Sequence, residues 1–365
     1  MVLKMFMLKK SNSPLNFLVE SVVDQHSLNF WLQKVNPLWS VDQALGKIVQ
    51  KDNTAEEMVS LTIEVNRHFK MGQAGQHHPV MVDVQGARYE RTYSLTQIDA
   101  QHVLLSVKKV EQGKVSNWLI NQAQIGDVLE FGQPYGDMLL PKQNQPMILL
   151  AAGSGITPMY SLLTALTQSE QLRERKVHVM YWVKHYADFA FKSYFEQWAK
   201  QYPQFSYQVF YTQEENADAR LNAAQVEVLT DIDQSIVYAC GPSGFVQQAE
   251  QLFAQAQLFQ SEAFSMTPVV NDDTGFVNVT LSKSNKVVAI PRGQSILVGL
   301  EHANVKPTYG CRMGVCHKCV CNKVQGSTQD MLNGQKNSEP SNPLKLCVSS
   351  AKTDLVIDLS ERSIL

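Results

Sequence analysis

The spacing of the cysteines near the carboxyl terminus constrains this chain more than any other feature. Cys311, Cys316 and Cys319 form the pattern C-x4-C-x2-C, and Cys347 follows after a gap of 27 residues. This pattern is typical of the thiolates that hold a plant-type [2Fe–2S] cluster. Four thiolates must converge on two irons, so we expect one tight loop to supply three of them and a distant segment the fourth.

Zinc is the alternative occupant of these cysteines. Structural zinc sites usually combine two closely spaced ligand pairs, which the four-residue gap between Cys311 and Cys316 does not supply. Cys321 is surplus to the pattern, and we expect it to pack in the core or lie beside the cluster without binding it. Five of the six cysteines fall within the last 55 residues, which indicates metal binding rather than disulfides.

The composition excludes several classes of protein. Hydrophobic residues make up 44% and charged residues 18% of the 365 positions, as in ordinary globular chains. The formal net charge of −2 provides no field that would hold a nucleic acid. No apolar run approaches the ~18 residues that a membrane span needs, and the first residues lack the pattern of a secretory signal. We expect a cytoplasmic protein of two or three domains.

Changes in the sequence pattern divide the chain into four parts. Residues 1–40 form an amino-terminal extension with partly helical spacing over 15–22. Residues 41–143 contain six short runs rich in Val, Ile, Thr and Tyr, which predict an antiparallel β-barrel. Residues 144–265 alternate strand-like and helical segments and predict a parallel sheet with helices on both faces. Residues 266–365 hold short strands, one helical segment and the cysteine loop.

The barrel region carries residue types that suit a flavin. Arg91, Tyr93 and Ser94 would supply a cation for phosphate, an aromatic face for the ring and a hydroxyl near N5. About twenty residues later, the segment Gly113-Lys114-Val115-Ser116 stands at a predicted helix start, where backbone N–H groups could cradle a pyrophosphate. An ordinary barrel strand and a hairpin turn are the alternative interpretations.

The third region carries residues that suit a pyridine nucleotide. Gly153, Gly155, Thr157 and Pro158 follow an apolar strand and open a helix, which is the context of a phosphate-binding turn. The third glycine of G-x-G-x-x-G is absent, so the general dinucleotide fingerprint is not met. Cys240-Gly241-Pro242 ends the last predicted parallel strand, where the thiol could lie beside a nicotinamide ring.

The loop after the second parallel strand bears on the choice between NADPH and NADH. Lys184 and His185 favour the 2′-phosphate of NADPH, and Arg220 is a further candidate. Asp188 favours NADH instead, because an acidic side chain there would bind the 2′-hydroxyl of NADH. We therefore expect NADPH, with NADH as the alternative.

Together these motifs resemble the ferredoxin–NADP reductase superfamily over residues 41–365. The resemblance implies a flavin-binding barrel, an α/β nucleotide domain and an α+β ferredoxin domain of the β-grasp type, with FAD favoured over FMN. The order of the three regions is similar to the phthalate dioxygenase reductase group, which supplies oxygenases and desaturases.

The amino-terminal extension has a resemblance of its own. Phe30-Trp31-Leu32 and Asn36-Pro37-Leu38-Trp39-Ser40 are similar to bacterial reductases that work with membrane acyl-CoA Δ9-desaturases. This implies a docking arm and contact with the inner face of a membrane through the partner. A helix that packs on the barrel is the alternative.

The expected activity is electron transfer from NAD(P)H to an acceptor that takes single electrons. A nicotinamide gives two electrons as hydride and a [2Fe–2S] cluster takes one, and a flavin can divide the pair. We expect Ser94 near flavin N5 and Cys240 near nicotinamide C4 to be the catalytic residues. The acceptor would be a desaturase, with a Rieske-type or other oxygenase as the alternative. A non-catalytic iron–sulfur or zinc interaction protein is the alternative of another class.

Charge suggests where such a partner would dock. Residues 266–365 hold 11 Lys and Arg against 8 Asp and Glu, a balance of +3. Arg312, Lys318 and Lys323 lie near the cysteines in the sequence. We expect these residues to form a basic surface for an acidic partner.

Overall fold

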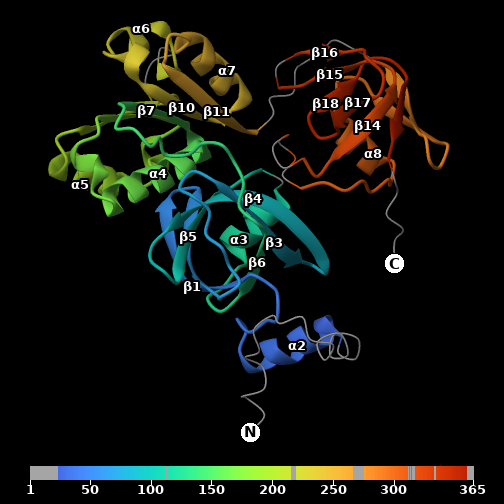
Figure 1. Cartoon of the computed structure of the whole chain (residues 1–365), viewed down its shortest axis with the longest axis horizontal. Coiled ribbons are helices and arrows are strands. Elements are labelled where there is room, and N and C mark those ends of the chain that lie inside the picture. Colours follow the sequence, from blue (N-terminus) through green and yellow to red (C-terminus); the bar gives the residue numbers. More distant parts are fainter. Residues whose placement is uncertain are drawn as a thin grey trace.

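The structure is a computed structural model in three domains with a short amino-terminal helix (Figure 1). It describes residues 24–111, 113–214, 219–265, 275–310, 312, 314, 317–332 and 334–359. The predicted helical segment over 15–22 lies outside these residues, as do Cys311 and Cys316.

The first domain is a closed antiparallel barrel, as the six Val-, Ile-, Thr- and Tyr-rich runs predict. Its strands lie in the order β1-β2-β5-β4-β3-β6. Their bounds are β1 Leu45–Ala55, β2 Met58–Val65, β3 His77–Val84, β4 Ala87–Gln97, β5 His102–Lys108 and β6 Val128–Phe131. Helix α3, Lys114–Asn121, packs its buried Val115 and Leu119 against the barrel core. The strands place alternate apolar side chains inside, as period-two patterning requires.

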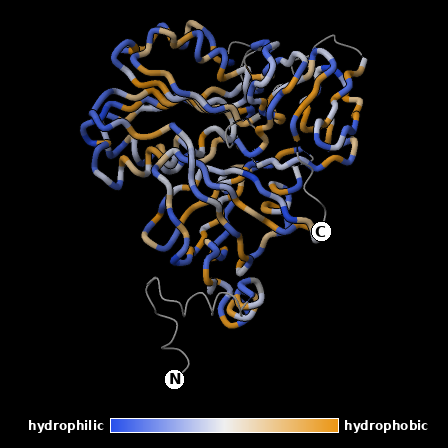
Figure 2. The backbone as a smooth tube through the Cα atoms, turned by 45° about the vertical axis from the view of Figure 1, so that its right-hand side comes forward, coloured by the Kyte–Doolittle hydropathy of each residue, from blue (hydrophilic) through white to orange (hydrophobic). Residues whose placement is uncertain are grey.

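The second domain is a five-stranded parallel sheet in the order β11-β10-β7-β8-β9. The strands are β7 Met147–Ala152, β8 Val177–Val183, β9 Phe205–Tyr211, β10 Ile236–Pro242 and β11 Leu258–Ser265. The helices are α4 Ile156–Gln168, α5 Lys192–Gln201, α6 Ala223–Glu227 and α7 Ser243–Leu252. The central strands are nearly continuous apolar runs, which appear orange in the hydropathy colouring (Figure 2). Such runs are expected because helices cover both faces of the sheet.

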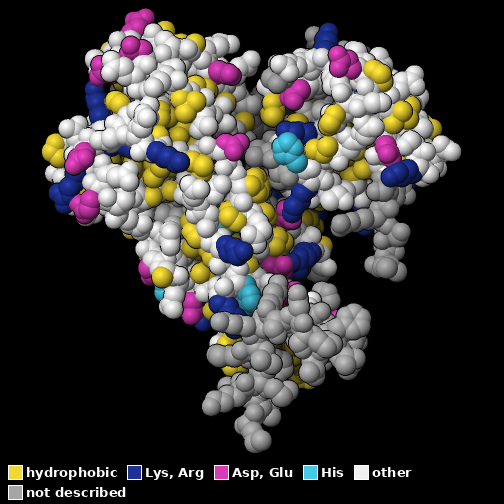
Figure 3. All heavy atoms as spheres, in the orientation of Figure 1, with side chains coloured by type: hydrophobic (Ala, Val, Ile, Leu, Met, Phe, Trp, Pro, Cys, Tyr) yellow, Lys and Arg dark blue, Asp and Glu magenta, His cyan; other side chains and the backbone are white. Residues whose placement is uncertain are grey.

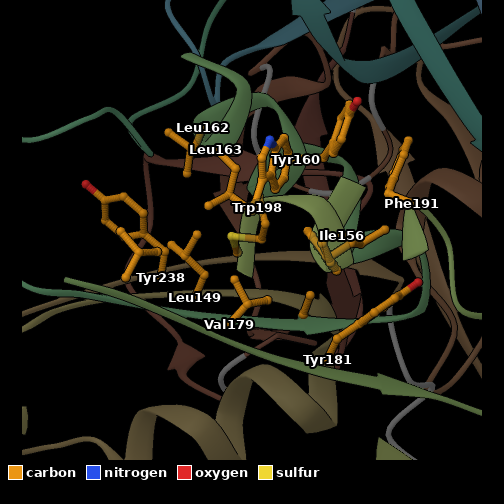
Figure 4. Packing of buried hydrophobic residues seen from close by; sticks show 14 of the residues in the cluster. Leu149, Ile156, Tyr160, Leu162, Leu163, Val179, Tyr181, Phe191, Trp198 and Tyr238 are labelled. Atoms are coloured by element: carbon orange, nitrogen blue, oxygen red, sulfur yellow. The ribbon is translucent and has the colours of Figure 1, made fainter. Parts of the chain in front are cut away.

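Each face of this sheet has its own apolar core. On the face covered by α4 and α5, Tyr160 stacks on Phe191 with ring centroids 3.8 Å apart and lies beside Trp198 (Figure 4). The Ser161 hydroxyl of α4 donates to the Leu95 carbonyl of β4 at 2.8 Å, which ties this domain to the barrel. Helix α5 begins at Lys192, directly after Phe191, which adopts a left-handed backbone with φ 61°.

The third domain begins at strand β12 and contains helix α8, Ile296–His302. Its main sheet has the order β13-β12-β19-β14-β17, and β12 and β19 run parallel. The bounds are β12 Phe276–Leu281, β13 Lys286–Pro291, β14 Val320–Gln325, β17 Asn342–Lys345 and β19 Leu355–Asp358. A small sheet adds β15 Thr328–Asp330, β16 Lys336–Asn337 and β18 Ser349–Ala351. One helix packed across a mixed sheet gives the α+β arrangement that the resemblance implies.

Helix α2, Gln25–Val35, lies beyond the end of the barrel (Figure 1). The segment that follows it anchors it: Asn66 donates to the Leu38 carbonyl at 3.1 Å, and Val41 donates to the Asn29 side chain at 2.8 Å. Among the residues that the structure describes, no helix is long and apolar enough to cross a bilayer.

A histidine inside the barrel makes the stability of the fold dependent on pH. Burial lowers the pKa of His78 to about 4, and its Nε2 accepts the Gly72 N–H at 3.0 Å. Between pH 6.5 and 4, His78 is therefore protonated in the unfolded chain but remains neutral in the folded chain. Stability is full above the unfolded pKa and falls by about 3 kcal/mol as the pH drops to 4. Urea unfolding at pH 7 and pH 4 measures this loss.

His78→Gln keeps an acceptor for Gly72 and removes the titrating group. We expect this variant to lose about 3 kcal/mol less than the parent over the same pH range. An identical pH dependence in the two proteins would show that other groups cause the acid sensitivity.

Candidate functional site

A cavity of about 800 Å³ lies where the three domains meet, within the range of small-molecule sites. The barrel lines it with β4, β5 and the start of α3, and the nucleotide domain adds Ser154 and Thr157. Phe264 from β11 and five residues of the third domain complete the wall. Those five residues are Glu301, Asn304, Lys306, Tyr309 and Arg312.

The barrel wall brings together the residues that the sequence predicts for a flavin. Arg91, Tyr93 and Ser94 on β4 line the cavity with Gly113 and Ser116 at the start of α3. Because β4 pairs with β5 and helix α3 follows β5, residues about twenty positions apart meet at one end of the barrel.

Three features of this wall fit a phosphate-bearing cofactor. The buried Ser116 hydroxyl has no hydrogen-bond partner among the described residues, and it lines the cavity. A Cβ on Gly113 would stand 2.5 Å from that hydroxyl, so the glycine leaves the Ser116 hydroxyl accessible at the helix start. The helix N-terminus adds N–H groups that attract anions. These residues therefore fit the pyrophosphate of FAD.

A buried polar chain leads from the cavity to strand β11. His77 Nδ1 lies 2.9 Å from the Ser94 hydroxyl, and His77 Nε2 contacts the Glu262 carboxylate. The Phe264 ring packs edge-on against His77 with centroids 5.9 Å apart. Ser94 is thus held in position from the side that faces away from the cavity.

The turn predicted for the nucleotide phosphates forms where the sequence places it. Gly153–Gly155 is a single turn between β7 and α4, with φ +56° at Gly153. A Cβ on Gly155 would lie 1.9 Å from the Cys240 carbonyl oxygen, so the turn sits directly against β10. Pro158 lies in the first turn of α4, and Thr157 lines the cavity.

Cys240 is fully buried in the core of the nucleotide domain. Burial, and then the nearby Glu262 carboxylate, raise the pKa of its thiol, so it is uncharged near neutral pH. Gly241 is buried beside it and Pro242 is exposed at the strand end. The structure places Cys240 directly beneath the Gly155 turn.

Lys184 and Arg220 lie apart from the cavity. Lys184 is exposed just after β8, and Arg220 is exposed just before α6. The His185 ring lies 3.0 Å from the Glu214 carboxylate. The Asp188 carboxylate accepts a hydrogen bond from the His185 backbone N–H at 3.2 Å. The Asp188 carboxylate therefore closes its own turn.

In the third domain, the structure brings two of the predicted cluster ligands together. The sulfur atoms of Cys319 and Cys347 lie 3.2 Å apart, although 27 residues separate them in the chain. The Leu346 N–H donates to the Cys319 carbonyl at 3.2 Å, which fixes the two segments side by side. Cys321 is buried in the same core. Convergent cysteines of this kind fit an iron–sulfur cluster.

The predicted basic docking surface is wrong for Lys323, and the structure pairs the other two residues on which it rested, Arg312 and Lys318, with carboxylates. Arg312 pairs with Glu301 inside the domain, and Lys318 pairs with Glu90 of the barrel at 2.7 Å. Lys323 is fully buried and donates to the Asn337 carbonyl and side chain at 2.6 and 2.7 Å. Each of these positive charges already has an oxygen partner within the molecule.

Sequence reasoning missed several residues of the site. Strand β11, with Glu262 and Phe264, was not expected, because its sequence LFQSEAFS mixes polar and apolar residues as an edge strand does. Tyr309 and Arg312 line the flavin cavity from a different domain. A second cavity of about 770 Å³ lies between α7, β11 and the third domain, and Figure 3 shows the hollow between these domains.

Three family models match the chain in the same order as the three domains. An oxidoreductase FAD-binding domain matches residues 46–139, and an oxidoreductase NAD-binding domain matches residues 149–251. A 2Fe-2S iron-sulfur cluster binding domain matches residues 279–352. The fold and site define an NAD(P)H-dependent reductase that uses FAD and a [2Fe–2S] cluster. The match to an iron–sulfur domain favours the cluster over zinc as the occupant of the cysteines.

Similarity to known proteins extends over most of the chain. An NADPH oxidoreductase of Mycobacterium tuberculosis is 31% identical over 340 residues, covering 90% of this chain and 88% of that protein. The chain therefore belongs to the ferredoxin–NADP reductase family of oxidoreductases, in the group with a carboxyl-terminal 2Fe–2S domain. Phthalate dioxygenase reductase of Burkholderia cepacia is 27% identical over 86% of this chain and 96% of its own. A solved structure of a phthalate dioxygenase reductase shares the fold, with a TM-score of 0.63 and 24% identity over 86% of this chain and 97% of that one.

Proposed function

We propose that this reductase takes electrons from NADPH and delivers them singly, through FAD and the cluster, to a fatty-acyl desaturase. The observation that carries the proposal is the aromatic surface of the amino-terminal segment. Phe30, Trp31 and Trp39 are 54%, 68% and 45% exposed, although side chains of this kind are usually buried. Such a surface supports the docking-arm interpretation.

The attachment of α2 supports the same interpretation. The segment after the helix is held to the barrel by the hydrogen bond from Asn66 and to α2 by the bond from Val41 to Asn29, while the aromatic side chains are left exposed. Exposed aromatic residues in a cluster are characteristic of surfaces that bind partners.

We also propose the roles of individual residues. Arg91, Tyr93, Gly113, Val115 and Ser116 would bind FAD. Ser94 would hydrogen-bond near N5, with His77 and Glu262 behind it to hold the hydroxyl in place. Bound by these residues, FAD would supply the exchange between two-electron and one-electron transfer, so that one NADPH would yield NADP⁺, one proton and two reduced acceptors.

The remaining roles concern the nucleotide and the cluster. The Gly153–Gly155 turn with Thr157, Pro158, Gly241 and Pro242 would hold the nucleotide, with Cys240 packed near nicotinamide C4. Cys311, Cys316, Cys319 and Cys347 would be the cluster ligands.

Reconstitution tests the acceptor directly. The purified reductase, NADPH and stearoyl-CoA would be combined with membranes that contain an acyl-CoA Δ9-desaturase. We expect a Δ9-unsaturated acyl product that requires both proteins and NADPH. No product from the desaturase, together with turnover of a Rieske-type oxygenase, would contradict the proposal. The similarity to phthalate dioxygenase reductase over 86% of the chain favours that second candidate.

The docking arm has its own test. Trp31→Ala should lower desaturase-coupled turnover about tenfold, because buried aromatic residues dominate the energy of many interfaces. Cytochrome c reduction should stay unchanged, since α2 is remote from the cavity. Val228→Ala, at an equally exposed position on the nucleotide domain, serves as the control. Equal loss in both assays would show that Trp31 is needed for folding instead.

The preference for NADPH rests on Lys184 and Arg220. Lys184→Gln and Arg220→Gln should each raise KM for NADPH about tenfold and leave KM for NADH unchanged, because only NADPH carries the 2′-phosphate. Lys192→Gln removes an exposed charge from α5 of the same domain and serves as the control. Steady-state kinetics with both nucleotides would contradict this assignment if neither variant altered the ratio of the two KM values.

A further inference from the structure

Positive charge reaches the flavin cavity from two different domains. The lining includes Arg91, Lys108 and Lys114 from the barrel, and Lys306 and Arg312 from the ferredoxin domain. The one carboxylate in the described lining belongs to Glu301, which pairs with Arg312. Lys108 lies 4.0 Å from Glu57 and 3.9 Å from Asp188, and Arg312 pairs with Glu301. The described residues therefore leave Arg91 and Lys114 on the barrel wall and Lys306 on the ferredoxin wall without a carboxylate partner, which favours an anionic ligand in contact with both walls.

Arg91 and Arg312 face the same space. Burial, and then the positive charge of Arg312, lower the pKa of Arg91. The Arg91 guanidinium donates to the Glu90 backbone carbonyl at 2.7 Å, and this carbonyl carries no full charge to balance that of the arginine. Two guanidinium groups are stable at one site when an anion lies between them.

Each wall also holds a hydrogen-bonding group that lacks a partner. On the barrel side this is the Ser116 hydroxyl, and on the ferredoxin side it is the buried Nε–H of Arg312, within the part of the chain that the structure describes. The Arg312 guanidinium lies 4.1 Å from the centre of the Tyr309 ring, and Glu301 holds its other end. The arginine is therefore positioned before any ligand binds, with one donor still available.

We propose that the ferredoxin domain forms part of the FAD site, and that Arg312 binds the FAD pyrophosphate from the side opposite Arg91. The FAD-binding match ends at residue 139, and Arg312 lies inside the 2Fe–2S match, so this contact joins two domains. The Lys318–Glu90 ion pair joins the same two domains close by in the sequence. FAD binding and docking of the ferredoxin domain then strengthen each other, because coupling between binding events is reciprocal.

Retention of FAD by the purified holoenzyme tests the proposal without measuring activity. The fluorescence of FAD released on dilution gives its dissociation constant. We expect R312Q to raise this constant about tenfold or more, since charge-assisted contacts to phosphate are among the strongest hydrogen bonds. Lys283→Gln removes a positive charge on the same domain that pairs with Asp358 at 3.3 Å outside the cavity, and should leave retention unchanged.

Arg312 adjoins Cys311, so the visible spectrum of the cluster must be recorded with each variant. An R312Q protein that keeps its cluster and binds FAD as tightly as the parent would overturn the proposal. Weaker NADPH binding with unchanged FAD retention would assign the arginine to the nucleotide and overturn it equally. If R312Q loses its cluster, Lys306→Gln decides: about threefold weaker FAD retention supports a ferredoxin wall in the site, and unchanged retention refutes it.

Discussion

Cys347→Ser is expected to abolish reduction of one-electron protein acceptors while NADPH still reduces the flavin. The Cys347 sulfur lies 3.2 Å from that of Cys319, and a [2Fe–2S] cluster needs four such ligands. Loss of the cluster removes the exit for single electrons but leaves the flavin cavity and the nucleotide turn in place. Cytochrome c reduction should fall to background, whereas NADPH oxidation with a small two-electron acceptor should continue. Cys316→Ser should behave in the same way.

Cys321→Ser is the matched control, because Cys321 is a buried cysteine of the same core that stands outside the C-x4-C-x2-C pattern. This variant should keep the cluster spectrum and both activities. Equal loss of the two activities in Cys347→Ser would contradict a linear path from flavin to cluster. Loss of the cluster in Cys321→Ser would show that the ligand assignment is wrong.

Gly155→Ala should disrupt the nucleotide-binding domain. The added Cβ would lie 1.9 Å from the Cys240 carbonyl oxygen and 2.4 Å from its carbon. Both contacts are with backbone of a central strand, so neither partner can rotate away. We expect a loss of more than about 4 kcal/mol of stability, in the range that only severe core clashes reach. The urea midpoint and NADPH binding measure this effect.

Gly153→Ala is the control for the same turn. Gly153 has φ +56°, but no atom lies within 4 Å of its Cβ position. The cost should be only the strain of a left-handed alanine, about 1–2 kcal/mol, with NADPH binding retained. Similar losses in the two variants would mean that backbone conformation, and not the contact with β10, makes glycine necessary at both positions.

The parts of the fold that follow from local pattern could be predicted. The six barrel strands, the nearly continuous apolar runs of the central parallel strands and helix α4 can each be recognised from the residues along their own length. Strand β11 lacks such a pattern because it lies at the edge of its sheet and contacts the barrel through the polar Glu262. The start of α5 depends on the left-handed Phe191, which no propensity predicts.

The residues of the candidate site also fall into those that the sequence could predict and those that it could not. Ligand spacing and the order of short motifs identify a flavin, a pyridine nucleotide and a [2Fe–2S] cluster, because each cofactor needs particular residue types close together in the chain. The positive charges near the cysteines, by contrast, did not predict a docking surface. Lys318 and Lys323 lie close to the cluster loop in sequence, but Glu90 and Asn337 bind them from elsewhere.

The sequence alone therefore determined which cofactors the chain binds and in what order the domains follow, because those properties depend on residues within one loop or one strand. Only the tertiary structure decided what surrounds the flavin cavity. Its wall includes Arg312 and Tyr309 of the ferredoxin domain, and its Ser94 is held through His77 by Glu262. Contacts between residues far apart in the chain form only when whole domains pack together, and local spacing carries no information about them.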